Sequence, residues 1–202
     1  MHFDFFTFLI YSPRGSSENA AKSRRLLGAC KNGNPDFSRI LAGLIIENNE
    51  SSFFDNSILV PIPRSTPTVE GAVFPSNVIA ETLVRRGLGN GVSGCLKRIV
   101  AIPKSSGQYS AETRNSVQTH LDSLSAEPEL IMEADLILID DVLTLVRTAM
   151  ASAIKLKDSF PEKNIKIFCP FRTRSFEDQN ILTKIEHGEM MLSPYNKVIL
   201  PD

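Results

Sequence analysis

The stretch Asp135-Leu136-Ile137-Leu138-Ile139-Asp140-Asp141 decides the fold that we expect for this chain. Four consecutive aliphatic residues in a short run are typical of a central parallel strand, which is buried on both faces. An acidic pair stands directly after them, where the strand would end. Because ligands of parallel α/β sheets bind beyond the carboxyl ends of the strands, we expect Asp140 and Asp141 to line a ligand site.

The segments around this stretch predict an alternation of strands and helices. Upstream, residues 57–63 form a short apolar run that prolines close, and residues 76–87 have helical spacing. Downstream, residues 149–156 present the packing side of a helix, and residues 165–169 read as another strand. This alternation predicts an α/β fold with a parallel sheet and helices on both of its faces.

The rest of the chain is expected to complete a single domain of residues 1–202. We divide it into an N-terminal helical or hood part (1–50), a core (51–175) and a C-terminal extension (176–202). Residues 3–11 look like a strand or a buried apolar edge, and two helices are expected before residue 47. The polar stretch 96–124 is interpreted as a functional or mobile loop.

Composition excludes several classes of protein. The net charge of -1 gives no overall attraction to nucleic acid or an anionic membrane, although a local basic patch stays open. The three cysteines lie far apart, which excludes a zinc ribbon and predicts buried, reduced thiols. No apolar run approaches a membrane span, and the N-terminus lacks the features of a signal peptide. We therefore expect no membrane partner and a cytoplasmic location.

The residues after the acidic pair suggest a site for a sugar phosphate. Adjacent carboxylates can accept hydrogen bonds from a sugar diol, or hold a hydrated magnesium ion. Thr144 and Thr148 follow at the start of a helix, whose N-terminal amides favour an anion. The alternatives are a simple helix-capping pair for the two aspartates and ordinary helix-start hydroxyls for the two threonines.

These residues carry a resemblance to a known family. The run from Ile137 to Thr144, with Thr148 four residues on, resembles the phosphoribosyl-pyrophosphate (PRPP) motif of type I phosphoribosyltransferases. The segment 23–34 and the strand end Val60-Pro61-Ile62-Pro63 are similar to the ComF-type branch of that family. The resemblance spans roughly residues 20–175 and implies a parallel-sheet type I phosphoribosyltransferase-like fold with helices on both faces.

The resemblance also implies a reaction and a set of site residues. A phosphoribosyltransferase would bind PRPP or a related nucleotide-like ligand and transfer phosphoribose to a nitrogen acceptor, with magnesium held through the ligand. The implied roles are ribose contacts by Asp140 and Asp141, 5′-phosphate contacts by Thr144, Arg147 and Thr148, pyrophosphate contacts by Arg64 and Ser65, and lid contacts by Lys104 and Arg114.

The sequence departs from the family's pattern in the phosphate loop, and this departure supports a second reading. Leu145 and Val146 stand where the family carries a small residue and then a glycine, so we expect Val146 to disturb the phosphate cradle. The zinc ribbon of the ComF branch is also absent. The alternative is a catalytically inactive module of the same fold that senses a nucleotide or binds a protein or single-stranded DNA partner. A homodimer stays open.

The remaining polar residues give weaker signals. The three histidines, His2, His120 and His187, show no metal-ligand spacing and no triad, and are interpreted as structural or surface residues. Arg24 and Arg25, together with Lys22, are interpreted as a solvated helix face.

Overall fold

A central sheet organises the chain in the computed structural model, which describes residues 1–67, 71–104, 115–174, 180–194 and 197–200. Its strands lie side by side in the order β10 (Val198–Ile199), β9 (Thr183–Leu192), β1 (His2–Tyr11), β8 (Asn164–Thr173), β6 (Asp135–Ile139), β2 (Ser57–Pro61) and β3 (Gly91–Val92). The short strand β7 (Val142–Leu143) pairs with β8 beside this row. The architecture is mixed α/β, as the alternation of elements predicts.

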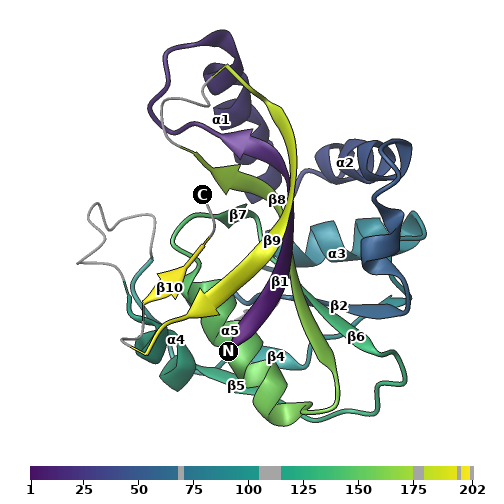
Figure 1. The fold of residues 1–202 in the computed structure, drawn as a ribbon, viewed down its shortest axis with the longest axis vertical. Coiled ribbons are helices and arrows are strands. Elements are labelled where there is room, and N and C mark those ends of the chain that lie inside the picture. Colours follow the sequence, from purple (N-terminus) through teal and green to yellow (C-terminus); the bar gives the residue numbers. More distant parts are fainter. Residues whose placement is uncertain (68–70, 105–114, 175–179, 195–196, 201–202) are drawn as a thin grey trace.

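The middle of the sheet is parallel. β6 lies between β2 and β8 and pairs with both in parallel, while β1 continues the parallel order beyond β8. β9 runs antiparallel along β1, and the two strands cross the middle of the molecule together in Figure 1. The strand predicted at 136–140 is β6, Asp135–Ile139; it is central and parallel, and the acidic pair follows its carboxyl end, so this prediction is confirmed.

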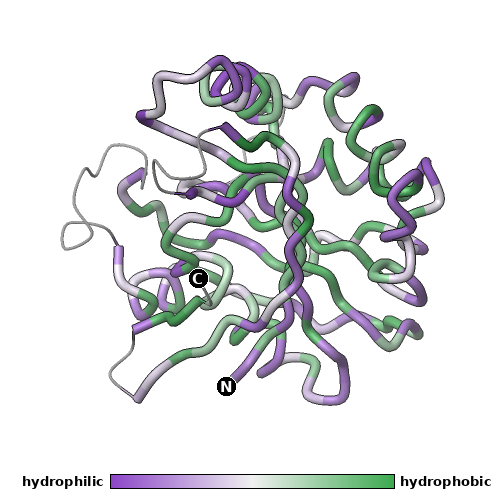
Figure 2. The backbone as a smooth tube through the Cα atoms, turned by 45° about the horizontal axis from the view of Figure 1, so that its top comes forward, coloured by the Kyte–Doolittle hydropathy of each residue, from purple (hydrophilic) through white to green (hydrophobic). Residues whose placement is uncertain are grey.

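Side chains alternate between two hydrophobic layers, one on each face of the sheet. On one face, Phe6, Ile137 and Phe168 pack against the helices α1 (Glu18–Lys31), α2 (Pro35–Glu47) and α3 (Pro75–Arg85). On the other face, Leu136 and Leu138 pack against α5 (Arg147–Ser159). Figure 2 shows the hydrophobic residues concentrated on the strands and on the helix sides that face them. Because both faces are covered, β6 is aliphatic at every position from Leu136 to Ile139.

The helices begin where the sequence provides caps. Ser17 accepts a hydrogen bond from the Ala20 amide at the start of α1, at 3.1 Å. Asn34 accepts from the amides of Asp36 and Phe37, and Pro35 occupies the first turn of α2. These side chains satisfy amides that have no partner within the helix. None of the helices among the described residues is long and apolar enough to cross a membrane.

The polar stretch 96–124 is more ordered than predicted. It contains β4 (Leu96–Arg98) and α4 (Val117–Ser123), and β4 pairs with β5 (Leu124–Ala126). The loop interpretation is therefore wrong for both ends of the stretch, and residues 105–114 lie outside the described part. The helix escaped prediction because its buried side combines Val117 with the polar residues His120 and Ser123, which removes the apolar period.

The sheet also draws strands from both ends of the chain. β1 comes from the segment that we expected to form a hood, and β9 comes from the expected C-terminal extension. β1 pairs with β8 of the parallel core and β9 pairs with β1, so the sheet includes strands from outside residues 51–175.

Candidate functional site

The acidic pair stands where β6 ends. The Asp140 amide donates to the carbonyl of Phe168 at 3.2 Å, which continues the pairing with β8 by one residue. The Asp141 amide then turns back and donates to the Asp140 carboxylate at 2.9 Å. The Asp141 carboxylate lies 3.8 Å from the Lys31 ammonium, at the end of α1. The pair is therefore held by the sheet on one side and by α1 on the other.

The loop after the pair leads directly into α5. Val146 precedes the helix with φ 55° and ψ 5°, which is the left-handed conformation that favours glycine. Its side chain is buried in the core. Within the part of the chain that the structure describes, no side chain forms a capping hydrogen bond at the α5 N-terminus. The glycine-type backbone expected in a phosphate loop is thus present, although a valine adopts it.

Two cavities meet at the acidic pair. The first, of about 600 Å³, lies over the loop 142–148, and the second, of about 520 Å³, lies over residues 62–65. Both are lined by Lys31, His120, Asp140, Asp141 and Thr148. We call them the phosphate lobe and the pyrophosphate lobe, after the roles predicted for their residues.

The lobes collect most of the site residues that the sequence predicts. Thr144, Arg147 and Thr148 line the phosphate lobe, where the Thr144 hydroxyl lies 2.7 Å from that of Thr173. Arg64, Ser65 and Lys104 line the pyrophosphate lobe. Arg114 lies outside the described residues.

Arg98 is a buried cation that sequence reasoning did not assign. It lies on β4, and its guanidinium donates to the carbonyl of Arg64 at 2.9 Å and to the hydroxyl of Ser123 at 2.5 Å. Burial lowers the pKa of Arg98 to about 10, while the negative charge of Asp140 opposes that shift. The side chain therefore stays charged at neutral pH and faces the acidic pair from the pyrophosphate lobe.

The two carboxyl groups are costly to ionise together. Burial raises the pKa of Asp140, and the charge of Asp141 raises it further, against the opposing effects of Lys31 and Arg98. Burial also raises the pKa of Asp141, although Lys31 opposes this. Hydroxyl donors or a cation placed at the pair would stabilise the charged forms.

His120 joins the two lobes. It is only 3% exposed, and its Nε2 lies 3.4 Å from the Thr148 hydroxyl on α5. Its Nδ1 is buried without a hydrogen-bond partner among the described residues. Burial and the charges of Arg98 and Arg147 lower the pKa of His120 to about 4, so the ring is neutral at pH 7. Its interpretation as a structural or surface residue missed its place in the site.

Arg24 is not part of a solvated helix face. Its guanidinium donates to the carbonyl of Ser12 at 3.0 Å and to that of Gly15 at 2.8 Å. The Ser12 amide donates in turn to the hydroxyl of Ser23, at 3.2 Å. The turn at residues 12–15 is thereby fixed against α1, and it forms one wall of the phosphate lobe.

The donor set suits a metal ion that arrives with its ligand. Among the described residues, no group of three or more histidine, cysteine or acidic side chains is placed to hold a metal. Magnesium typically keeps several waters and takes one or two carboxylates together with substrate phosphates. Asp140 and Asp141 can supply that part.

Comparison of the sequence with protein-family models and with curated proteins found no match to this chain.

Proposed function

We propose that this chain binds PRPP, or a closely related ribose phosphate, and transfers phosphoribose to a nitrogen acceptor. The main observation that supports this proposal is that the acidic pair lies where two cation-lined lobes meet. PRPP has the matching order of groups, with a sugar diol between a 5′-phosphate and a pyrophosphate. The fold proposed with this function is that of the type I phosphoribosyltransferases.

The charges of the two lobes support a ligand that is anionic at both ends. The pyrophosphate lobe is lined by the cations Lys31, Arg64, Arg98 and Lys104, and the phosphate lobe by Arg14, Lys31, Arg147 and Arg174. The only carboxylates among the described residues that line either lobe are Asp140 and Asp141. Charge-assisted hydrogen bonds from such cations to phosphate oxygens are among the stronger polar contacts in proteins.

In the proposed reaction the protein positions its substrate and stabilises charge. The bond between the anomeric carbon and pyrophosphate breaks, and the pyrophosphate leaves with the electron pair. The acceptor nitrogen forms the new bond and releases its proton. Asp140 and Asp141 hold the diol and offset positive charge on the sugar, while Arg64, Arg98 and Lys104 bind the leaving group. Bound magnesium would neutralise part of the pyrophosphate charge.

A second candidate function is a binding module without transferase activity. Leu145 and Val146 favour it, because these larger residues stand in the lining of the phosphate lobe where the family carries a small residue and a glycine. Such a module would sense a ribose phosphate or nucleotide, or present the site to a protein or single-stranded DNA partner. Measuring pyrophosphate release with a panel of nitrogen bases separates the two functions, since only the transferase produces it.

Calorimetric titration with PRPP and magnesium tests the proposal. We expect saturable binding that weakens about 100-fold or more in the Asp140→Asn/Asp141→Asn variant, because two carboxylate acceptors are lost. The matched control is Asp122→Asn/Asp158→Asn, which removes two exposed charges that line neither lobe. A folded wild type without PRPP binding, or equal binding by the Asp140/Asp141 variant, would contradict the proposed function.

A further inference from the structure

The phosphate lobe is larger than one phosphate group requires. Its volume of about 600 Å³ falls within the roughly 300–1,000 Å³ typical of pockets for whole small-molecule ligands. Beyond the loop 142–148 it continues along the ends of β1 and β8, where Tyr11, the turn 12–15, Thr173 and Arg174 line it. We call this continuation the outer subsite.

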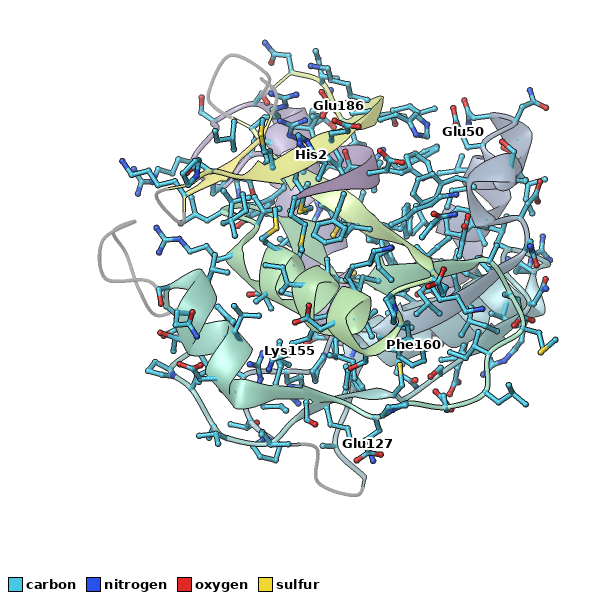
Figure 3. The ribbon with its side chains drawn as sticks, turned by 60° about the horizontal axis from the view of Figure 1, so that its bottom comes forward. His2, Glu50, Glu127, Lys155, Phe160 and Glu186 are labelled. Atoms are coloured by element: carbon cyan, nitrogen blue, oxygen red, sulfur yellow. The ribbon has the colours of Figure 1, made fainter. Side chains whose placement is uncertain are left out.

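A fixed cation forms one side of the outer subsite. The Arg174 guanidinium pairs with Glu186 on β9, a residue labelled in Figure 3, and the Arg174 side chain is only 14% exposed. Arg172 and Lys184 also lie near Glu186, each with a nitrogen 3.4 Å from its carboxylate. Three cations therefore surround one carboxylate, which leaves an excess of positive charge next to the cavity.

Arg14 supplies a second cation to the lining of the outer subsite. It lies in the turn 12–15, whose carbonyls Arg24 fixes from α1. Because the backbone of this turn is anchored, its position relative to Arg174 is set by α1 and β1. Arg174 is tied to the same strand, since its amide donates to the carbonyl of Tyr11 at 3.1 Å.

The outer subsite is continuous with the proposed 5′-phosphate position. The Thr144 hydroxyl, from the phosphate loop, lies 2.7 Å from the hydroxyl of Thr173 at the end of β8. One ligand could therefore extend from one region into the other, or two ligands could lie side by side.

We propose that the outer subsite binds a second anionic group, a carboxylate or a phosphate, between Arg14 and Arg174. The inference rests on the proposed function for the identity of the neighbouring ribose phosphate. It deepens that function by specifying the substrate class: either the acceptor is itself an anion, or the ribose phosphate carries a further anionic substituent.

Two titrations of the full-length protein distinguish these sources. To test whether the second anion belongs to a separate acceptor, benzoate is titrated into the protein with and without saturating ribose 5-phosphate. To test whether it belongs to the ribose phosphate itself, the affinities for uridine 5′-diphosphate and uridine 5′-monophosphate are compared. We expect either saturable benzoate binding or tighter binding of the diphosphate than of the monophosphate. In Arg14→Gln and in Arg174→Gln, the benzoate affinity or the diphosphate preference should fall about tenfold or more.

Matched variants isolate the outer subsite. Arg25→Gln removes an exposed charge from α1 that does not line the cavity, and should leave both titrations unchanged. Arg14→Gln leaves the pair between Arg174 and Glu186 intact, so its result stands even if Arg174→Gln fails to fold. In Asp140→Asn/Asp141→Asn, benzoate binding should persist while ribose phosphate binding is lost, which separates failure of the proposed function from failure of this inference. The outer subsite would be overturned if the protein showed no saturable benzoate binding and also showed no preference for the diphosphate that depends on Arg14.

Discussion

Val146 stores backbone strain at the entrance to α5. A β-branched residue with φ 55° is an outlier, because the left-handed region brings Cβ close to the following carbonyl at a cost of roughly 1–2 kcal/mol. Burial of the side chain in the core offsets part of this cost. Strain of this kind concentrates at functional sites, where the surrounding structure maintains it.

At position 146, a glycine variant should be more stable than an alanine variant, which is the reverse of the usual order. We expect Val146→Gly to be more stable than Val146→Ala by about 1 kcal/mol, because both variants lose packing but only glycine relieves the strained φ. Urea unfolding measures the difference. At Lys155, inside α5 and labelled in Figure 3, glycine should instead be about 1 kcal/mol less stable than alanine. Alanine exceeding glycine at both positions would show that Val146 is not strained.

His120 should make the fold sensitive to acid. Its pKa of about 4 in the folded protein lies below the ordinary value of 6.5, so between these pH values the unfolded chain binds more protons. Stability contributed by the neutral ring is therefore complete above pH 6.5 and is lost as the pH falls toward 4. The raised pKa values of Asp140 and Asp141 act in the opposite direction, so His120 must be isolated by difference.

The variant His120→Gln provides that difference. Between pH 7 and pH 4.5, we expect the wild type to lose about 1–3 kcal/mol more of its free energy of unfolding than the variant does. Denaturant titrations at several pH values measure this, with His187→Gln, which replaces a half-exposed histidine on β9, as the control. Parallel pH profiles for wild type and His120→Gln would contradict a low pKa for His120.

At the scale of elements, α1 holds two parts of the phosphate lobe in place. We call the hydrogen bonds from Arg24 and Ser23 to the turn 12–15 the clamp. α1 contributes Lys31 next to Asp141, and it also contributes Arg24 and Ser23, which hold the turn. A single helix thus positions a charge at the acidic pair and the wall that carries Arg14. Movement of α1 relative to β6 would change both.

Arg24→Gln should loosen the turn without unfolding the protein. Loss of two charge-assisted hydrogen bonds is expected to cost about 1–3 kcal/mol of stability, and amide hydrogen exchange should increase at residues 12–15. Arg25→Gln, one residue along the same helix and exposed, should change stability by less than about 0.5 kcal/mol. Equal effects of the two variants would mean that Arg24 does not act as a clamp.

On the scale of the whole molecule, the sheet depends on its first strand. β1 lies between β8 and β9, and its residues Phe5, Phe6, Phe8 and Ile10 are fully buried. Phe5 belongs to the hydrophobic layer on one face and Phe6 to the layer on the other. The strand therefore connects the parallel core to β9, which carries Glu186.

Deletion of residues 1–11 should abolish cooperative folding. The truncated chain loses several large side chains from both layers, and burial of each contributes about 1.5–3 kcal/mol, which together exceeds the net stability of a typical domain. Circular dichroism during urea unfolding tests this against the full-length chain. A sigmoidal transition in the truncated protein would show that the core folds without β1.

Local sequence alone was sufficient to predict the central strand of the sheet and the position of the acidic pair at its end. The run 136–139 is apolar at every position, which is typical of a short strand covered on both faces. Asp140 and Asp141 follow it directly, so their place at the strand end depends on covalent order alone. The caps of α1 at Ser17 and of α2 at Asn34 also act locally, because each bonds to amides two or three residues away.

Only the tertiary structure decided which side chains line the two lobes that meet at the acidic pair. Arg98, His120 and Arg174 come from separate elements, and in the sequence each looks like any polar residue of a surface segment. Their meeting depends on the order of the strands and on the packing of α4 against α5, which are set by long-range contacts that leave no periodic signal. The conformation of Val146 belongs to the same class: its sequence identity opposes a positive φ, and the packing of the loop between β6 and α5 imposes one.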